Sequence, residues 1–438
     1  MKPILIGIFV GLLTISIVSP AQAARISGKI QVFATAERIA ERSNYQDTVL
    51  KQFEKLHPGV TIETIRTPWP ENTRFQALLV SGTPPDIWMS VGMKSSNLYV
   101  DQGVWMDLTP LITRDKIDLS QYFQPALDVT TFRGMRYGLP IVMFTDALIY
   151  NVDLFNEAGL PHPPHDYNDT SWTWEKYLEY SKKLTRDTNG DGVPEVWGND
   201  GIVPAHIPTV AASFGGFPFS PDFRKAQFDS PGIIKAYELI RDMQFKYHVT
   251  PTNKERTALG LGSVAFDRGV VGMRIDFIMR AGDYAYRKDL HFDLAAKPRG
   301  PAGPKVLLYL NTLNILANAP NPEATWELVK YLSRPDVLPG LAVYGYNGIP
   351  ATKNGAGLFV EHMKKIRPDV DWIVFIKGAP YAMSVEYWRP NYTEIDALVA
   401  QMTSPILNNE KDVASGLKEL NDRVQAILDK YWASREKK

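Results

Sequence analysis

A run of carboxylate and amide side chains after residue 186 is spaced like the ligands of a calcium loop. Four residues take the first, third, fifth and sixth positions of that pattern: Asp187, Asn189, Asp191 and Gly192. Gly198 stands at the twelfth position, where such loops need a glutamate, and Glu195 at the ninth could compensate only in part. We therefore predict no cofactor, with calcium at this loop as the alternative to a plain turn.

Aromatic side chains form a second group that could bind a ligand. They make up 11% of the chain, which suits a site for flat or ring-shaped faces. Two prolines hold Trp69 in Thr-Pro-Trp-Pro, so we expect it on a loop, where it could stack on a ligand. Tyr387, Trp388 and Arg389 form an aromatic and cationic cluster that predicts either a ligand platform or a packed loop.

No arrangement typical of a catalytic site stands out in the sequence. There is no nucleophile elbow, no HExxH helix and no convincing triad. His162 and His165 have metal-like spacing, but the prolines between them favour a rigid exposed loop. We predict that the protein is not an enzyme.

The hydrophobic pattern predicts an α/β scaffold for these side chains. Alternating apolar residues indicate strands over 29–34 and 60–65. Between them, apolar residues recur at helical spacing: Tyr45, Val49, Phe53 and Leu56. Strand, helix, strand is how a parallel α/β sheet begins.

Later segments continue this alternation. The turn over 81–86 should deliver Asp86 and Trp88 at a strand end, where open α/β sheets place ligands, although Trp88 is more often a core residue. Asn321 and Pro322 predict the start of a helix, with Asn321 as its cap. The chain ends in a long amphipathic helix over 413–431.

The first 23 residues read as a secretory signal peptide. Lys2 precedes an apolar run over 4–18, and Ala21-Gln22-Ala23 matches a cleavage site. The run is shorter than the roughly 20 apolar residues of a membrane span. We predict cleavage near Ala23 and a periplasmic location.

Composition narrows the range of partners. The chain has no cysteine, so neither a lipid on a cleavage-site cysteine nor a disulfide is available to it. Its 48 basic residues balance 48 acidic ones, which gives no basic field for nucleic acid. A chain of 438 residues is long enough for two or three domains.

Six strings, in order along the chain, resemble the extracellular solute-binding proteins of family 1, the family of maltose-binding protein. They are FEKLHPGVTIE, SGTPPDIW, GLPIVMFTDALIYNVDLFNEAGL, SWTWEKYLEYSKKLTRDTNGDG, FDRGVVGM and PEATWELVKYL. The resemblance extends from about residue 29 to the last helix. It implies a two-lobed periplasmic binding protein fold, with discontinuous α/β domains joined by a hinge and the ligand cleft between them.

The resemblance also implies where the lobes lie. Lobe one would take residues 24–145 and 310–378, and lobe two residues 146–309 and 379–438. Crossing strands would lie near residues 144–146, 309–311 and 377–379.

The same resemblance implies further ligand contacts. A sugar needs aromatic rings for its C–H faces and polar side chains for its hydroxyls. Asp146 matches an acidic ligand contact of the family, against the alternative of a helix or turn cap. Glu37 and Arg38 would contact the ligand or begin a solvated helix. Arg274 and Asp276 precede a family platform, whose tryptophan is missing here because Met279 stands near that position.

The function implied is that of the substrate-binding component of an ABC importer. A monomer would bind a sugar or oligosaccharide and deliver it to permease subunits in the inner membrane. One alternative keeps the fold and binds a glycerol-phosphate-like or other polar solute, since Arg38, Arg274 and Arg389 could pair with a phosphate. A less favoured alternative is a secreted glycoside hydrolase.

Overall fold

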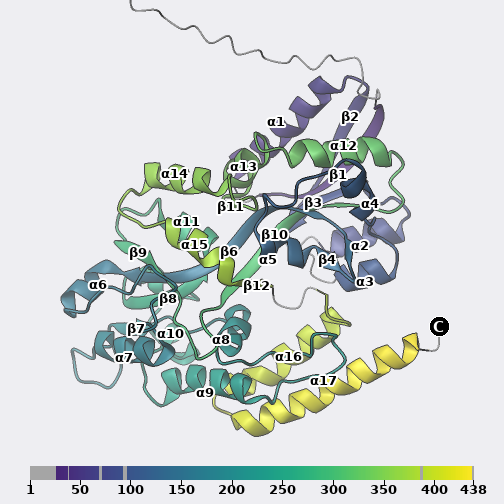
Figure 1. The fold of residues 1–438 in the computed structure, drawn as a ribbon. Coiled ribbons are helices and arrows are strands. Elements are labelled where there is room, and N and C mark those ends of the chain that lie inside the picture. Colours follow the sequence, from purple (N-terminus) through teal and green to yellow (C-terminus); the bar gives the residue numbers. More distant parts are fainter. Residues whose placement is uncertain (1–25, 38, 69–71, 92–95, 385–387, 437–438) are drawn as a thin grey trace, which may run out of the picture.

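The computed structural model describes residues 26–37, 39–68, 72–91, 96–384 and 388–436 (Figure 1). Its strands are β1 Gly28–Thr35, β2 Val60–Thr67, β3 Ile87–Val91, β4 Thr131–Phe132, β5 Met135–Arg136, β6 Leu139–Asn151, β7 Trp197–Asn199, β8 Val271–Phe277, β9 Phe292–Ala295, β10 Val306–Ile315, β11 Ile349–Pro350 and β12 Ala382–Ser384. Its α-helices are α1 Ala40–Leu56, α2 Asn72–Val80, α3 Ser96–Asp101, α4 Thr109–Arg114, α5 Gln124–Val129, α6 Val152–Glu157, α7 Trp174–Leu184, α8 Ile207–Ser213, α9 Pro231–Phe245, α10 Asn253–Ala258, α11 Ile278–Tyr284, α12 Pro322–Leu332, α13 Leu338–Gly340, α14 Ala356–Ile366, α15 Ile373–Gly378, α16 Tyr392–Leu407 and α17 Val413–Arg435.

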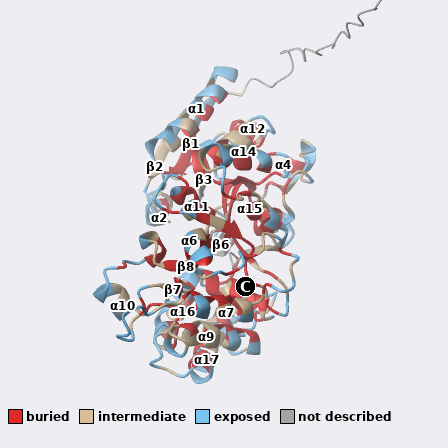
Figure 2. Ribbon diagram, turned by 90° about the vertical axis from the view of Figure 1, so that its left-hand side faces the viewer, coloured by how far each residue is buried: buried red, intermediate tan, exposed pale blue. Residues whose placement is uncertain are grey.

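One large mixed sheet runs through the molecule. Its strands lie in the order β2-β1-β3-β10-β6-β8-β7, and β9, β11 and β12 pair with strands of this path. The parallel pairing of β1 with β2 and β3 confirms the α/β opening that the sequence predicts. Figure 2 shows buried strands inside a shell of more exposed helices.

Strand β6 joins the two halves of this sheet. All 13 of its residues are buried, which explains the apolar runs over 139–144 and 147–150 on either side of Thr145 and Asp146. Residues 139–145 pair with β10, whereas residues 146–151 pair with β8 and β9. Asp146 therefore lies where β6 changes partners.

Two hydrophobic clusters pack on the sheet: the larger extends over both halves, and the second packs on β6, β8 and β9. The larger cluster includes Trp88, whose ring lies 4.3 Å from that of Phe75, which confirms the expectation that Trp88 is a core residue. The second cluster includes Trp174, Tyr177 and buried residues of α17. Figure 1 shows α9, α16 and α17 together at the end of the molecule opposite α1 and α12.

Most of the predicted elements are confirmed, with two differences. Helix α12 begins at Pro322, but the Asn321 side chain makes no cap and instead donates from Nδ2 to the Lys29 carbonyl, 3.1 Å away. At residues 377–379 the prediction of a crossing strand is wrong, because α15 and a short 3₁₀ helix occupy this segment. Strand β12 follows at Ala382 and pairs with β10.

The other two predicted crossings fall within β6 and β10. The exact limits of the lobes stay a prediction. The predicted signal peptide, residues 1–23, lies outside the described residues. Among the helices that the structure describes, none combines the length and apolar character of a membrane span.

Candidate functional site

A cavity of about 660 Å³ lies among α8, α9 and α16 and reaches β10. The helices line it with residues at helical spacing, so each contributes one face. These residues are Ile207, Pro208 and Ala211 of α8, Ile233, Tyr237, Ile240 and Gln244 of α9, and Tyr392, Asp396, Val399, Ala400, Thr403, Ser404 and Leu407 of α16. Tyr309 of β10 and Arg389 also line it, so the cavity extends to the crossing strands.

Of the predicted site residues that the structure describes, Arg389 lines this cavity. Its side chain is only 5% exposed, and Nη2 lies 3.0 Å from a carboxylate oxygen of Asp396. Its guanidinium carbon lies 4.3 Å from the ring centroid of Tyr392, a cation–π contact. The cavity therefore has a positive charge, an aromatic ring and a carboxylate within one stretch of eight residues, 389–396.

A second paired charge on the cavity is formed by Asp200 and Arg256. Nη1 of Arg256 lies 2.8 Å from Oδ1 of Asp200, whose side chain has no exposed surface. The same carboxylate accepts hydrogen bonds from the amides of Ala265 and Phe266, at 3.1 and 3.2 Å. Arg256 and two backbone amides thus hold the buried Asp200 carboxylate in place.

Behind Asp200, the structure brings together the predicted pair Arg274 and Asp276. Both lie on β8, and Nε of Arg274 donates to Oδ2 of Asp276 at 2.7 Å. Arg274 also pairs with Asp200, so the charges alternate from Arg256 to Asp276. Burial opposes the charge of Arg274, but the carboxylates of Asp276 and Asp200 outweigh it and raise the pKa of Arg274.

Asp146 lies at the junction of the sheet, with no exposed surface. Its carboxylate accepts from Lys297 Nζ at 2.5 Å, His206 Nδ1 at 2.7 Å and the Leu307 amide at 2.8 Å. Burial opposes the charge, but Lys297 and His206 outweigh it and lower the pKa of Asp146. In this arrangement Asp146 holds β6, β10 and the start of α8 together and presents no surface to a ligand. Its ligand contact stays a prediction.

The other described candidates lie apart from the cavity lining. Asp86 precedes β3, at the strand's amino end rather than the end where a ligand was expected, and accepts from the Gln31 amide at 2.6 Å. Trp388 stacks on Phe132 at 4.7 Å and donates from Nε1 to the Val129 carbonyl. Glu37 follows the carboxyl end of β1 and is half-buried. The structure gives Asp86 and Trp388 packing roles, and ligand contacts for all three stay predictions.

Three candidates, Arg38, Trp69 and Tyr387, lie outside the described residues. Met279, near the position of the missing platform tryptophan, lies at the start of α11 and is 40% exposed.

The carboxylates of the acidic loop over 187–195 accept hydrogen bonds from groups of the loop itself. The Asp187 carboxylate accepts from the amides of Gly190 and Gly192, at 2.7 and 2.8 Å. Glu195 accepts from the amide and hydroxyl of Thr188. In the part of the chain that the structure describes, no group of three or more His, Cys, Asp or Glu residues could hold a metal ion. Calcium at Asp187, Asn189 and Asp191 stays a prediction.

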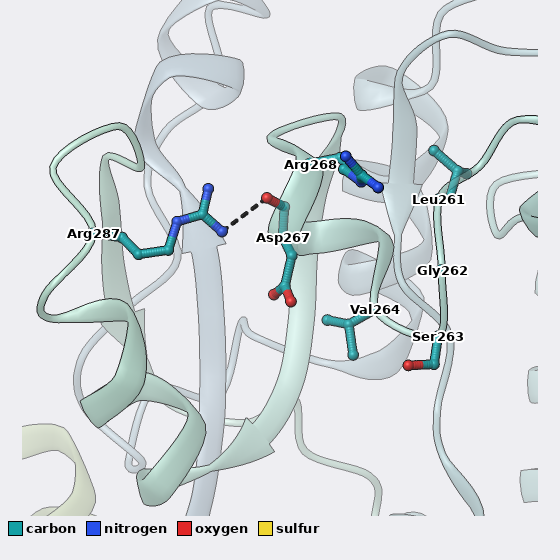
Figure 3. A pocket seen from close by; sticks show the side chains of 7 residues that line it. All are labelled: Leu261, Gly262, Ser263, Val264, Asp267, Arg268 and Arg287. Atoms are coloured by element: carbon teal, nitrogen blue, oxygen red, sulfur yellow. Dashed lines mark hydrogen bonds between the residues drawn. The ribbon is translucent and has the colours of Figure 1, made fainter.

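A smaller, polar hollow of about 460 Å³ lies near the cavity, with Ser263 on both. Figure 3 shows Arg268 and Arg287 on either side of Asp267. Arg287 already donates to the Asp267 carbonyl at 2.9 Å and pairs with Asp289 at 2.5 Å. We therefore assign the candidate site to the larger cavity, which has aromatic and aliphatic walls.

Several residues of the site and its junction carry no recognisable sequence signal. Asp200 contacts Arg256 and Arg274, which lie 56 and 74 positions later in the chain. Lys297 and His206, which contact Asp146, lie 151 and 60 residues after it in the chain. Only Tyr392 and Asp396, close to the predicted Arg389, could have been found by extending the aromatic and cationic cluster.

A sheet in which β6 pairs with different strands along its length, with a cavity reaching that junction, is the arrangement of a two-lobed α/β binding protein. Solved structures of this kind align with nearly the whole chain. The sugar-binding protein MalE of Xanthomonas citri aligns with a TM-score of 0.78 at 17% identity, over 94% of this chain and 100% of its own. An ABC substrate-binding protein of Listeria monocytogenes, in complex with cycloalternan, aligns with a TM-score of 0.75 at 21% identity, over 92% and 99%.

A comparison of the sequence with known families identifies the family of this chain. The profile of the bacterial extracellular solute-binding proteins matches residues 36–338, and the chain belongs to this family. A binding protein of Brucella abortus (strain 2308) is 25% identical over 342 residues, which are 75% of this chain and 77% of that protein. The resemblance inferred from six ordered strings is confirmed. The family and the similar structures are binding proteins rather than enzymes.

Proposed function

We propose that this protein binds a neutral sugar or oligosaccharide in the periplasm and delivers it to the permease subunits of an ABC importer. The observation that carries this proposal is the pairing of charges on the cavity. Arg389 faces Asp396, and Arg256 faces Asp200, so the cavity offers donors and acceptors without excess charge. Sugar hydroxyls both donate and accept, and Tyr309 and Tyr392 offer ring faces for the C–H surface of a sugar.

The same pairing argues against an anionic solute. A phosphate would compete with Asp396 and Asp200 for the two arginines and would bring its charge close to both carboxylates. It also argues against a hydrolase, because Arg256 and Arg274 already engage both carboxylate oxygens of Asp200. The cycloalternan bound by the similar Listeria protein agrees with a carbohydrate ligand.

A thermal-shift panel tests the ligand class. It contains maltose, maltotriose, lactose, glycerol 3-phosphate and spermidine, each added to the full mature chain. A ligand that binds only the folded state raises Tm with concentration. We expect a rise with at least one neutral sugar; a rise confined to glycerol 3-phosphate or spermidine would contradict the proposal.

A pair of tryptophan variants tests the location. Ala400 is exposed and lines the cavity from α16, whereas Ala397 is exposed on the same helix but does not line it. We expect Ala400→Trp to abolish the shift given by the best sugar and Ala397→Trp to retain it. Equal shifts in both variants would place the site elsewhere.

Export is part of the same proposal. A cleaved signal peptide would leave a mature chain beginning near Ala24, monomeric and able to reach a permease. Intact mass of the protein recovered from the periplasm checks this, and a mass that retains residues 1–23 would contradict it.

A further inference from the structure

Asn311 stands out among the buried polar side chains of the sheet. It lies on β10 with no exposed surface, and neither Oδ1 nor Nδ2 has a hydrogen-bond partner. The great majority of buried polar side-chain atoms in folded proteins have a partner, and an amide without one is costly. The unsatisfied amide of Asn311 therefore indicates a hydrogen-bond partner that this arrangement does not supply.

The ladder of the sheet places Asn311 beside the cavity. Tyr309 lines the cavity and lies two residues before Asn311, so both side chains leave the same face of β10. Phe277 of β8 continues this face, with its ring centroid 5.1 Å from that of Tyr309. The pairing of β10 with β6 shifts register between Asn311 and Thr312, which marks a local irregularity at this point of the junction.

Asn311 also has a chemistry that matches the proposed ligand. A carboxamide offers two donors and one carbonyl oxygen in a fixed plane, and neighbouring sugar hydroxyls can satisfy both ends at once. In the arrangement described here the amide is covered, so a ligand would reach it only when the two lobes move relative to each other.

We propose that Asn311 is a specificity-determining residue of the sugar site, whose amide donates to and accepts from hydroxyls of the bound sugar. This inference rests on the proposed function and deepens it. Tyr309 contributes a ring face, and Asn311, the next residue on the same face of the strand, distinguishes sugars by the position of their hydroxyls.

The test is Asn311→Leu, which keeps the size of the side chain and removes both polar ends. The probe is maltotriose, or the neutral sugar of the panel that raises the Tm of the wild type most. We expect titration calorimetry to give a Kd about tenfold weaker, the loss typical of a hydrogen bond between neutral groups. Without sugar, we expect the Tm of the variant to equal or exceed that of the wild type, because an unsatisfied amide has been removed.

Thr145→Val is the matched control. Thr145 is also fully buried with an unpartnered hydroxyl, but it lies three residues from Val142, the partner of Asn311, and so on the opposite face of β6. We expect its Kd to match that of the wild type. If Asn311→Leu does not fold, Asn311→Val takes its place under the same two measurements.

Three results would overturn the inference. If Asn311→Leu binds the sugar as tightly as the wild type, the amide contacts only an ordered water. If Thr145→Val loses as much affinity, the effect is general damage to the junction. If the wild type binds no neutral sugar, both the proposed function and this inference fail. The first two results, in contrast, overturn only this inference.

Discussion

Lys297 balances a carboxylate that has no access to water. Its Nζ lies 2.5 Å from Asp146, and both side chains are at most 1% exposed. Lys297→Met would leave Asp146 with His206 and one amide as partners, and breaking a buried pair in this way costs about 3–5 kcal/mol. We expect the free energy of unfolding, measured in urea, to fall by about this amount.

Lys288→Met is the control, since Lys288 is exposed. Its free energy of unfolding should stay within about 0.5 kcal/mol of the wild type. Similar values for the two variants would show that the Asp146 network contributes nothing particular to stability.

His165 lies between two carboxylates, with Nδ1 2.7 Å from Asp371 and Nε2 3.3 Å from Asp293. The hydrogen bond to Asp293 raises the pKa of His165 above its ordinary 6.5, although burial opposes this. Burial also opposes the charge of Asp293, but hydrogen bonds from His165 and the Asp371 amide outweigh it and lower the pKa of Asp293. That group therefore stays ionised near neutral pH.

The sign of the pH dependence follows from the raised pKa. Protonated His165 stabilises the folded state fully below pH 6.5, and this contribution is lost as pH rises through the raised pKa. His165→Asn should therefore lower stability by about 1 kcal/mol or less at low pH, and by less at high pH. Urea denaturation from about pH 5 to 8.5 checks this. A difference that grows with pH would contradict it, and His291→Asn, at an exposed site, is the control.

At the scale of elements, Gly198 lets β7 approach α7. A Cβ at residue 198 would clash with the Ser181 carbonyl, which cannot move without disturbing the helix. Gly198→Ala should therefore destabilise the fold by at least about 2 kcal/mol. Gly357→Ala on α14, where a Cβ meets nothing within 4 Å, should be neutral or stabilising by up to about 1 kcal/mol. Equal melting temperatures for the two variants would refute the close packing of β7 on α7.

The elements themselves were largely predictable because their signals are local. Periodicity alone predicted β1, α1 and β2, and the family resemblance implied the crossing strand that is part of β6. The bond of Asn321 to Lys29 was not predictable, because it depends on a strand almost 300 residues away. The helical conformation of residues 377–379 was also not predicted, because a short apolar segment fits either a strand or a helix.

At the scale of the whole molecule, the site was only partly predictable. The structure places the predicted Arg389 on the cavity and pairs the predicted Arg274 with Asp276 behind it, and their ligand contacts stay predictions. Their partners Asp200 and Asp396 were not predicted. Composition and family resemblance identify residue types, whereas the partner of a buried charge is decided by which strands and helices meet. This is why the pairing of charges on the cavity, on which we base the proposal of a neutral ligand, could be seen only in the fold.

The most direct test of the proposed sugar-binding function is isothermal titration of the full mature chain with the panel sugar that raises Tm most. Chromatography of the recovered sugar follows. We predict binding of one sugar per chain and recovery of that sugar unchanged. Absence of heat with every neutral sugar of the panel, or conversion of the sugar to products, would contradict it.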